Sequence, residues 1–377
     1  MTRSWRWAIV AAVVAFLVAL PLIVRSLPVG SASGSASGSA SSGSAGNLLA
    51  RILASAPHPY AGYAESTGTL ALPTAGQLTD IATLLGGRTQ VRTWWRSADD
   101  WRYDTVTPAG ELSSRTSPAG TQVFDFEDTD VAVTAPDVNG AVRLPRVSDT
   151  LPPLLAARLL SGATPAQVTT VPSRRVAGRP ADGLRMRPGD PLSSIDRVDV
   201  WADRASGVPL LVEVYGRNST AAAMSSTFLD FTDEEPAEAV VAFTPPPGSR
   251  VFTRQRLDLV GAVARTRSAP LPGTLLDYPR VTPQPGLEGI GQYGSGVTQL
   301  AVGVLPDRVA SSLRDQLKVA ANVTTLPEGI ALSVGPVGLL VTDPQVTGQT
   351  LLLSGTLTPQ GLALAATELR AATGAGP

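Results

Sequence analysis

The side chains that most often carry catalysis are scarce in this chain of 377 residues, which has no cysteine and a single histidine, His58. Without cysteine the chain cannot form a thiol nucleophile, a disulfide, a cysteine-based zinc site or a cysteine-linked lipid anchor. A serine–histidine dyad would have to use His58, which two prolines flank in the sequence Ala56-Pro-His-Pro-Tyr60. Those prolines indicate a rigid connector into a strand, so we expect His58 to be structural.

An acidic cluster made of Asp125, Glu127, Asp128 and Asp130 is a second place where chemistry could occur. Counted from Asp125, a calcium-binding loop needs glycine at position 130 and glutamate at position 136, but the chain has Asp130 and Pro136 there. We therefore interpret the cluster as the solvated tip of a hairpin. Two carboxylates could also hydrolyse a glycoside, but nothing in the spacing singles out such a pair.

The sequence Gly289-Ile-Gly-Gln-Tyr-Gly294 matches the glycine pattern of dinucleotide-binding loops. A genuine site needs a strand before the motif and a helix that starts inside it. Pro283 and Pro285 interrupt the preceding segment, and the following one alternates like a strand. We therefore predict no cofactor and no metal site, and a net charge of −1 gives no general attraction to nucleic acid.

Apolar residues alternate along the segments 197–201 and 210–215, as they do in strands with one buried face. Between them, the segment 203–209 supplies the Asp, Ser and Gly that a tight reversal needs. The stretch 176–231 is therefore predicted to be an antiparallel meander with an apolar face that must be covered. The residues on that face are Val198, Val200, Leu210, Val212 and Val214.

The clearest predicted hairpin spans 89–106 and reverses around Ser97, Ala98 and Asp99. Its register places aromatic pairs on one face and charged residues on the other, which makes it self-consistent. We expect Trp95, Trp101 and Tyr103 to point toward the concave, apolar side of the sheet. The predicted opposed pairs are Arg96 with Asp100, Trp95 with Trp101, Thr93 with Tyr103, Val91 with Thr105, Arg92 with Asp104 and Trp94 with Arg102.

This hairpin, its continuation at 107–111 and the segments 121–128 and 241–250 resemble actinobacterial LolA-like and MucB/RseB-like proteins. The resemblance covers about residues 47–250. It implies an α+β fold in which a strongly curved antiparallel sheet, an incomplete barrel, wraps around helices and encloses a cavity for acyl chains. These segments are signatures of a fold and not of an active site.

The segment Leu151–Leu160 is predicted to be a plug or lid helix for this sheet, because its leucines fall at helical spacing. Ordinary core packing is the alternative role for those leucines. Together with the resemblance, these patterns give the candidates for lining a ligand cavity. They are Trp95, Trp101, Tyr103, Phe124, Leu154, Leu155, Leu159, Val198, Val200, Val212 and Val214.

Residues 1–25 are predicted to anchor the protein in the membrane. Arg3 and Arg6 precede the apolar run Trp7–Val24, which as a helix of ~18 residues spans ~27 Å. The arginines favour a cytoplasmic N-terminus and an extracytoplasmic body, in a single-pass protein of the cell membrane. A cleaved signal peptide is the alternative. Residues 26–46 are rich in Ser, Gly and Ala and are expected to form a flexible linker.

The chain beyond the LolA/RseB-like part divides into a connector at 251–285, which could add an edge strand, and a small α+β domain at 286–377. Strands are expected at 297–304, 330–334, 338–342 and 349–355, and helices at 306–320 and 358–372. Low charge in this domain suggests a surface buried against a partner or against the first domain.

These features favour a non-enzymatic, membrane-tethered extracytoplasmic protein. The resemblance implies that it binds an acyl-chain lipid or a lipoprotein and regulates envelope-stress signalling through an anti-sigma factor, as MucB/RseB-like sensors do. The alternative is a lipid or lipoprotein carrier of the LolA or LprG kind. An extracytoplasmic hydrolase is a third class, disfavoured by the absence of cysteine and of a credible histidine dyad.

Overall fold

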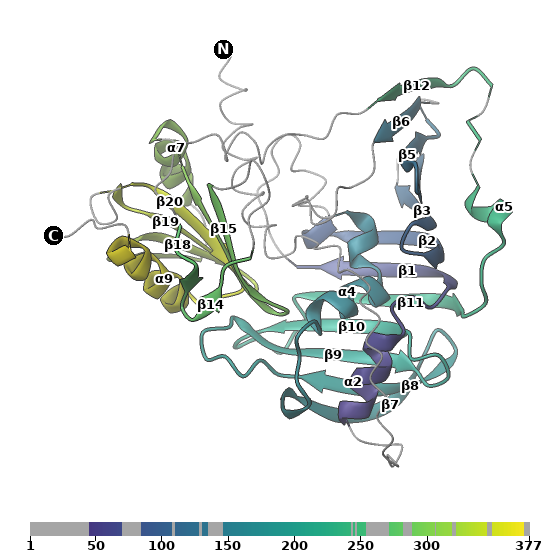
Figure 1. The fold of residues 1–377 in the computed structure, drawn as a ribbon, viewed down its shortest axis with the longest axis horizontal. Helices are drawn as coiled ribbons and strands as arrows, with labels where there is room; N and C mark the ends of the chain where they lie inside the picture. The colour runs from purple at the N-terminus through teal and green to yellow at the C-terminus, as the bar shows by residue number, and fades with distance from the viewer. Residues whose placement is uncertain are drawn as a thin grey trace.

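Two β-sheets carry most of the chain that the structure, a computed structural model, describes (Figure 1). The described residues are 45–69, 84–107, 110–127, 130–134, 146–242, 244–245, 247–253, 271–281, 289–305, 307–318, 322–344 and 349–372. The predicted membrane segment at 1–25 and nearly all of the predicted linker at 26–46 lie outside these ranges. No helix within them is long and apolar enough to cross a membrane.

The larger sheet has twelve strands in the order β12-β6-β5-β4-β3-β2-β1-β11-β10-β9-β8-β7 and is open, with β12 and β7 at its edges. Two antiparallel meanders, β1 to β6 and β7 to β11, join where β1 pairs with β11. The strands are β1 (Tyr60–Gly68), β2 (Arg88–Ser97), β3 (Asp100–Thr107), β4 (Gly110–Ser117), β5 (Gly120–Asp125), β6 (Asp130–Thr134), β7 (Val168–Val176), β8 (Arg179–Met186), β9 (Ile195–Asp203), β10 (Pro209–Gly216), β11 (Met224–Thr232) and β12 (Arg250–Thr253).

Helices α2 (Ala45–Ala54) and α4 (Pro152–Leu159) cover one face of this sheet, which we call the inner face (Figure 1). Helix α2 packs on β7 and β8, while α4 packs on β10 and β11. Two prolines, Pro152 and Pro153, open α4, where the missing amide hydrogens leave no helical bond unmade. The short 3₁₀ turn η3 (Val147–Thr150) comes after β6 in the sequence and directly precedes α4.

The register predicted for the β2–β3 hairpin is confirmed for five of its pairs, from Trp95 opposite Trp101 to Val91 opposite Thr105. The predicted reversal is one residue too long. Ser97, not Arg96, pairs with Asp100 through the backbone, and the extra residue Arg96 is accommodated as a bulge. The Arg96 side chain still reaches the Asp100 carboxylate, at 2.9 Å.

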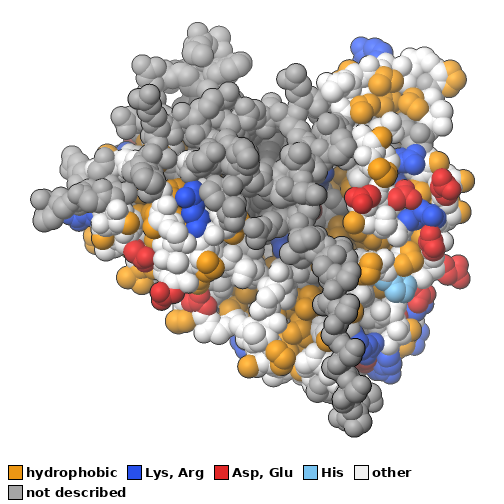
Figure 2. Space-filling model, viewed as in Figure 1, with side chains coloured by type: hydrophobic (Ala, Val, Ile, Leu, Met, Phe, Trp, Pro, Cys, Tyr) orange, Lys and Arg blue, Asp and Glu red, His pale blue; other side chains and the backbone are white. Residues whose placement is uncertain are grey.

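Strand β12 lies in the predicted connector region and adds to the edge of the larger sheet, parallel to β6. The bidentate pair between Arg250 and Asp130, at 2.8 and 2.9 Å, fixes this pairing at its first residue. Val251 on the same strand is 60% exposed. Figure 2 shows hydrophobic side chains gathered over this part of the sheet, at the upper right.

The smaller sheet has six strands in the order β15-β16-β20-β19-β18-β17. Helix α9 (Pro359–Ala372) packs on β19 and β20, and α7 (Asp307–Leu317) packs on β18. A two-stranded hairpin, β13 (Thr274–Leu275) with β14 (Tyr278–Pro279), precedes this sheet. The six strands are β15 (Ile290–Ser295), β16 (Thr298–Val304), β17 (Val323–Leu326), β18 (Gly329–Val334), β19 (Val337–Thr342) and β20 (Leu351–Gly355).

All the elements expected in the smaller sheet are present, but the sequence reading missed β15 and β17. Strand β15 contains residues 290–294 of the glycine motif that resembles a dinucleotide loop, and Gly289 comes just before it. Its last glycine, Gly294, has a φ of +80° and leads into the turn to β16, so it shapes a hairpin and does not open a helix. Glycine is a poor strand former by itself, which is why the pattern did not suggest a strand.

Candidate ligand site on the inner face

The apolar residues of β9 and β10 face the two helices. Val198, Val200, Val212 and Val214 are buried in one cluster with Leu155 and Leu159 of α4 and with the apolar side of α2. Directly opposed strand residues point to the same face of a sheet, and Val200 is opposite Val212, which is opposite Ser226 on β11. The inner face of this half is therefore an apolar surface that the helices close.

The same face continues across β1 into the aromatic residues of the hairpin. Ser226 is opposite Ser66, and alternate residues along β1 lead from Ser66 to Tyr60, which is opposite Trp95. Tyr60, Trp95, Trp101 and Tyr103 stack in sequence with ring-centre distances of 6.0, 6.0 and 5.2 Å. We call these four side chains the aromatic row.

Leu151 lies over the aromatic row in the same buried cluster, and Leu154 is half-buried against it. Phe228 and Phe231 of β11 extend the row beside Tyr60. The sequence reading missed Tyr60, Phe228 and Phe231 as members of this site. Their alternation could have placed them on an apolar face, but only the pairing of β1 with both β2 and β11 brings them to Trp95.

Three buried polar groups on the inner face have no hydrogen-bond partner in the described structure. They are the Tyr60 hydroxyl, the Trp95 indole N–H and the Ser66 hydroxyl. Burial raises the pKa of Tyr60, so its hydroxyl stays protonated and able to donate. By contrast the Trp101 indole N–H donates to the Ala98 carbonyl, at 3.1 Å. Burying a donor without a partner lowers the stability of the fold by about 1–3 kcal/mol. A ligand acceptor that hydrogen-bonds to one of these groups would recover that cost.

Phe124 does not join the aromatic row. It is opposite Ser113, and Ser113 is opposite Asp104, which belongs to the other face of β3 from Trp101 and Tyr103. Phe124 packs edge-on against Phe126 instead, with ring centres 4.6 Å apart. Of the predicted cavity residues, it is the one that the sheet places on the outer face.

The outer face of the same strands is charged. The Asp104 carboxylate is buried and accepts hydrogen bonds from Arg102, at 2.8 and 2.9 Å, and from Ser113, at 2.6 Å. Asp199 is bound in the same manner by Arg185, at 2.6 and 2.7 Å. Buried ion pairs therefore mark the outer face, whereas the inner face has an apolar surface suited to a hydrocarbon ligand.

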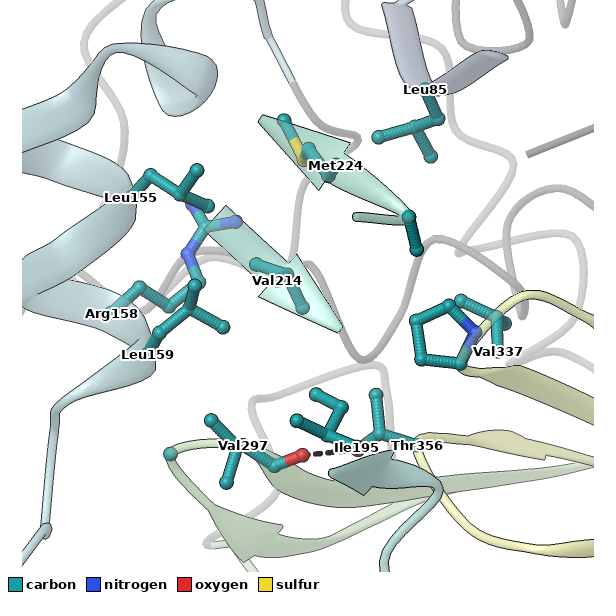
Figure 3. A pocket seen from close by; sticks show the side chains of 13 residues that line it. Leu85, Leu155, Arg158, Leu159, Ile195, Val214, Met224, Val297, Val337 and Thr356 are labelled. Atoms are coloured by element: carbon teal, nitrogen blue, oxygen red, sulfur yellow. Dashed lines mark hydrogen bonds between the residues drawn. The ribbon is translucent and has the colours of Figure 1, made fainter. Parts of the chain in front are cut away.

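A cavity opens at the end of α4, where the two sheets meet; we call it the junction cavity (Figure 3). Its volume of about 40 Å³ is enough for about one or two waters. Leu155, Leu159 and Val214 of the predicted site line it, so the structure brings these three together. The other lining residues are Leu85, Arg158, Ile195, Ala223, Met224, Gly296, Val297, Pro336, Val337 and Thr356.

Metal-ligating side chains do not gather in the part of the chain that the structure describes. No cluster of three or more His, Cys, Asp and Glu side chains there could hold a metal ion. The His58 ring lies against its own connector, with Nδ1 2.6 Å from the Pro59 carbonyl oxygen. What the inner face offers chemically is an apolar surface, stacked aromatic rings and a few buried donors, which is an arrangement for binding.

No protein-family model and no curated protein matches this chain. Among solved structures, the Pseudomonas aeruginosa MucA/MucB complex is similar at 17% identity with a TM-score of 0.47, over 85% of this chain and 96% of that one. A LolA superfamily protein from Nitrosomonas europaea is similar at 11% identity with a TM-score of 0.23, over 53% of this chain and 98% of that one.

A lipoprotein-sorting protein domain from Vibrio parahaemolyticus is similar at 12% identity with a TM-score of 0.20, over 49% of this chain and 90% of that one. Identities and TM-scores this low do not transfer a function from one protein to another, so function has to be argued from the site. The names MucB and LolA among these neighbours are the ones that the sequence resemblance also indicates.

Proposed function

We propose that this protein is a non-enzymatic, extracytoplasmic binding protein, tethered to the cell membrane by residues 1–25, that takes an acyl-chain lipid or the acylated end of a lipoprotein onto its inner face. The observation that carries the proposal is the cover of that face. Among the described residues, the apolar surface of the twelve-stranded sheet is covered mainly by two helices of ten and eight residues. These two helices can move away from the inner face without disrupting the hydrogen bonds of the sheet.

The chemistry of the inner face supports the same class of ligand. Hydrocarbon chains match the valine and leucine surface under α4, and the aromatic row gives them a further apolar wall. The unpartnered donors of Tyr60 and Trp95 would suit the carbonyl oxygens that link an acyl chain to its carrier, because a buried acceptor there restores hydrogen bonds that folding leaves unmade.

We further propose that binding serves regulation, with an anti-sigma factor of the same membrane as the protein partner. The sequence resemblance to MucB/RseB-like sensors supports this role, as does the predicted membrane anchor, which would keep the protein beside a membrane-bound partner. A lipid or lipoprotein carrier is the alternative. A carrier must hand its cargo to an acceptor, whereas a tethered regulator needs only to bind and release.

The test is to measure bound lipid by native mass spectrometry of the full chain released from nanodiscs of phosphatidylethanolamine and phosphatidylglycerol. A matched pair of variants on β1 separates the two faces of the sheet. Ala64→Phe adds a ring to the buried inner face, while Ala61→Phe adds the same ring to the outer face. We expect an acyl lipid on the wild type and on Ala61→Phe and a clear loss on Ala64→Phe.

Two outcomes would count against the proposal. If the wild-type protein never retains lipid, the proposal that it binds an acyl lipid is wrong. If the two variants retain lipid equally, the inner face is not the binding site. Transfer separates the regulator from the carrier: lipid that moves from the loaded, anchored protein to acceptor vesicles faster than it dissociates spontaneously would favour the carrier.

A further inference from the structure

The junction cavity has an apolar interior whose polar neighbours already have partners. The Thr356 hydroxyl donates to the Val297 carbonyl, at 2.6 Å, and accepts from the Gln299 amide, at 3.0 Å (Figure 3 shows the first bond). The Arg158 guanidinium lies 3.3 Å from the Asp149 carboxylate. A cavity of this kind holds water poorly and accepts hydrocarbon, as engineered apolar cavities do.

The walls of the junction cavity come from three parts of the molecule. Helix α4 contributes Leu155 and Leu159, and the larger sheet contributes Val214 and Met224 (Figure 3). The smaller sheet contributes Val297, from the turn between β15 and β16, and Val337, the first residue of β19. The cavity therefore exists only while the smaller sheet is docked against the larger one.

A short loop, Asp190–Ser194, holds that docking, and we call it the junction loop. The Ser194 amide donates to the Thr356 carbonyl, and the Thr358 amide donates to the Leu192 carbonyl, both at 2.9 Å. Tyr278 of β14 donates its hydroxyl to the Asp190 carboxylate. Thr356 lines the cavity and accepts a hydrogen bond from the loop, so the junction loop and the junction cavity are adjacent.

We infer that the junction cavity receives the hydrocarbon end of an acyl chain and that its occupation holds the smaller sheet against the larger one. The inference rests on the proposed function and adds where the end of the acyl chain binds. Room for about one or two waters suits the last carbons of a chain and not a whole chain. The remainder would continue along the inner face, since Met224 in the cavity wall is followed two residues later by Ser226, opposite the unpartnered Ser66 hydroxyl.

Occupation and docking must reinforce each other. A chain end in the cavity touches both sheets, so it is bound more tightly by the docked arrangement than by a separated one. By linkage, the factor by which the bound chain favours docking equals the factor by which docking raises the affinity for the chain. A protein that carried such a site would convert lipid binding on one sheet into a change in the position of the other.

The test uses the full chain in nanodiscs and hexadecanoic acid with a diazirine at its terminal carbon. Light releases dinitrogen from the probe and the resulting carbene inserts into neighbouring bonds, which peptide mass spectrometry then locates. We expect insertion around Leu155 and Leu159, in the turn that carries Val297 and at Val337. Val337→Phe should cut insertion there by at least about tenfold, because the added ring would occupy the space that the chain end needs.

Controls keep the result interpretable. Val240→Phe makes the same change on the half-exposed helix α5 (Glu238–Val241) and should leave insertion unchanged. Ala223→Leu fills the cavity with a smaller change, in case Val337→Phe fails to fold. Insertion confined to the aromatic row would overturn this inference and leave the proposed function standing, whereas no insertion at any position of the chain would overturn both.

A second measurement reads the coupling itself. Hydrogen exchange at the Ser194 and Thr358 amides should slow when unlabelled hexadecanoic acid is added to the wild type, because these amides bridge the two sheets. The slowing should be absent in Val337→Phe. Exchange that does not respond to the fatty acid while insertion occurs in the cavity would show that the chain end binds there without holding the sheets together.

Discussion

At the scale of single residues, two buried tyrosines differ in whether their hydroxyl has a hydrogen-bond partner. Tyr60 and Tyr293 are each 1% exposed. The Tyr293 hydroxyl donates to the Pro272 carbonyl, at 2.9 Å, and burial raises the pKa of Tyr293 to about 12. The Tyr60 hydroxyl has no partner among the described residues. The two side chains are therefore a matched pair that differs in one hydrogen bond.

Substituting phenylalanine at the two positions should affect the free energy of unfolding differently. Tyr293→Phe should lower the free energy of unfolding by about 1 kcal/mol, because the Pro272 carbonyl loses its donor. Tyr60→Phe should leave stability unchanged or raise it by up to about 1 kcal/mol, since it removes an unsatisfied hydroxyl. Urea unfolding of delipidated protein measures both. Equal destabilisation by the two changes would mean that the Tyr60 hydroxyl has a partner after all.

At the scale of an element, the turn between β9 and β10 depends on one buried carboxylate. Asp203 accepts from the Arg179 guanidinium, at 2.8 and 3.1 Å, and from the Ser206 amide and hydroxyl, both at 2.9 Å. Burial by itself would raise the pKa of Asp203, but these hydrogen bonds outweigh it and hold the pKa below its ordinary value. The carboxylate thus closes the meander that forms one wall of the site.

Asp203→Asn should destabilise the protein by about 1–3 kcal/mol at neutral pH, because the charge-assisted bonds are lost. A native pKa below the unfolded value gives stability that is present above about pH 4 and is lost as the pH falls through the native pKa. The difference between wild type and variant should therefore shrink as the pH falls from about 4. Urea unfolding at a series of pH values measures it.

Asp315→Asn is the control for this prediction, since that side chain is 74% exposed and pairs only at the surface with Lys318. Its effect should stay within about 0.5 kcal/mol. A destabilisation by Asp203→Asn that is the same at neutral and at acid pH would show that the charge of the carboxylate does not support the turn.

At the scale of the whole molecule, the position of the smaller sheet matters most, because the junction cavity needs both sheets. The junction loop pairs with the chain just before α9, and Ser193 forms an isolated bridge with Leu357. A Cβ added at Gly361 would lie 3.3 Å from the Cβ of Leu192. That separation is close to the 3.5–4.5 Å found in disulfides.

The double variant Leu192→Cys, Gly361→Cys should form a disulfide readily on mild oxidation, and the absence of native cysteine makes the product unambiguous. Intact mass and a thiol assay measure it. Leu192→Cys with Leu364→Cys is the control, because Leu364 is on the same helix but 52% exposed. Equal yields from the two double variants, or none from either, would contradict the docked arrangement.

The sequence alone determined the hairpin register and the apolar faces of β9 and β10. Both follow from a side-chain period of two and from turn residues, which act over a few positions along the chain. It did not reveal β15, where glycines hide the strand signal, and its pattern could not show that Phe124 lies on the outer face. Each of those depends on which strands pair.

Only the tertiary structure decided what the inner face encloses. Leu155 and Val337 meet in the junction cavity although they are far apart in the chain, and Tyr60 joins Trp95 only because β1 lies between β2 and β11. Burial without a hydrogen-bond partner is likewise invisible in a sequence, because it depends on every neighbour at once. Local periodicity fixes strands and faces, whereas a binding site needs side chains that long-range packing alone brings together.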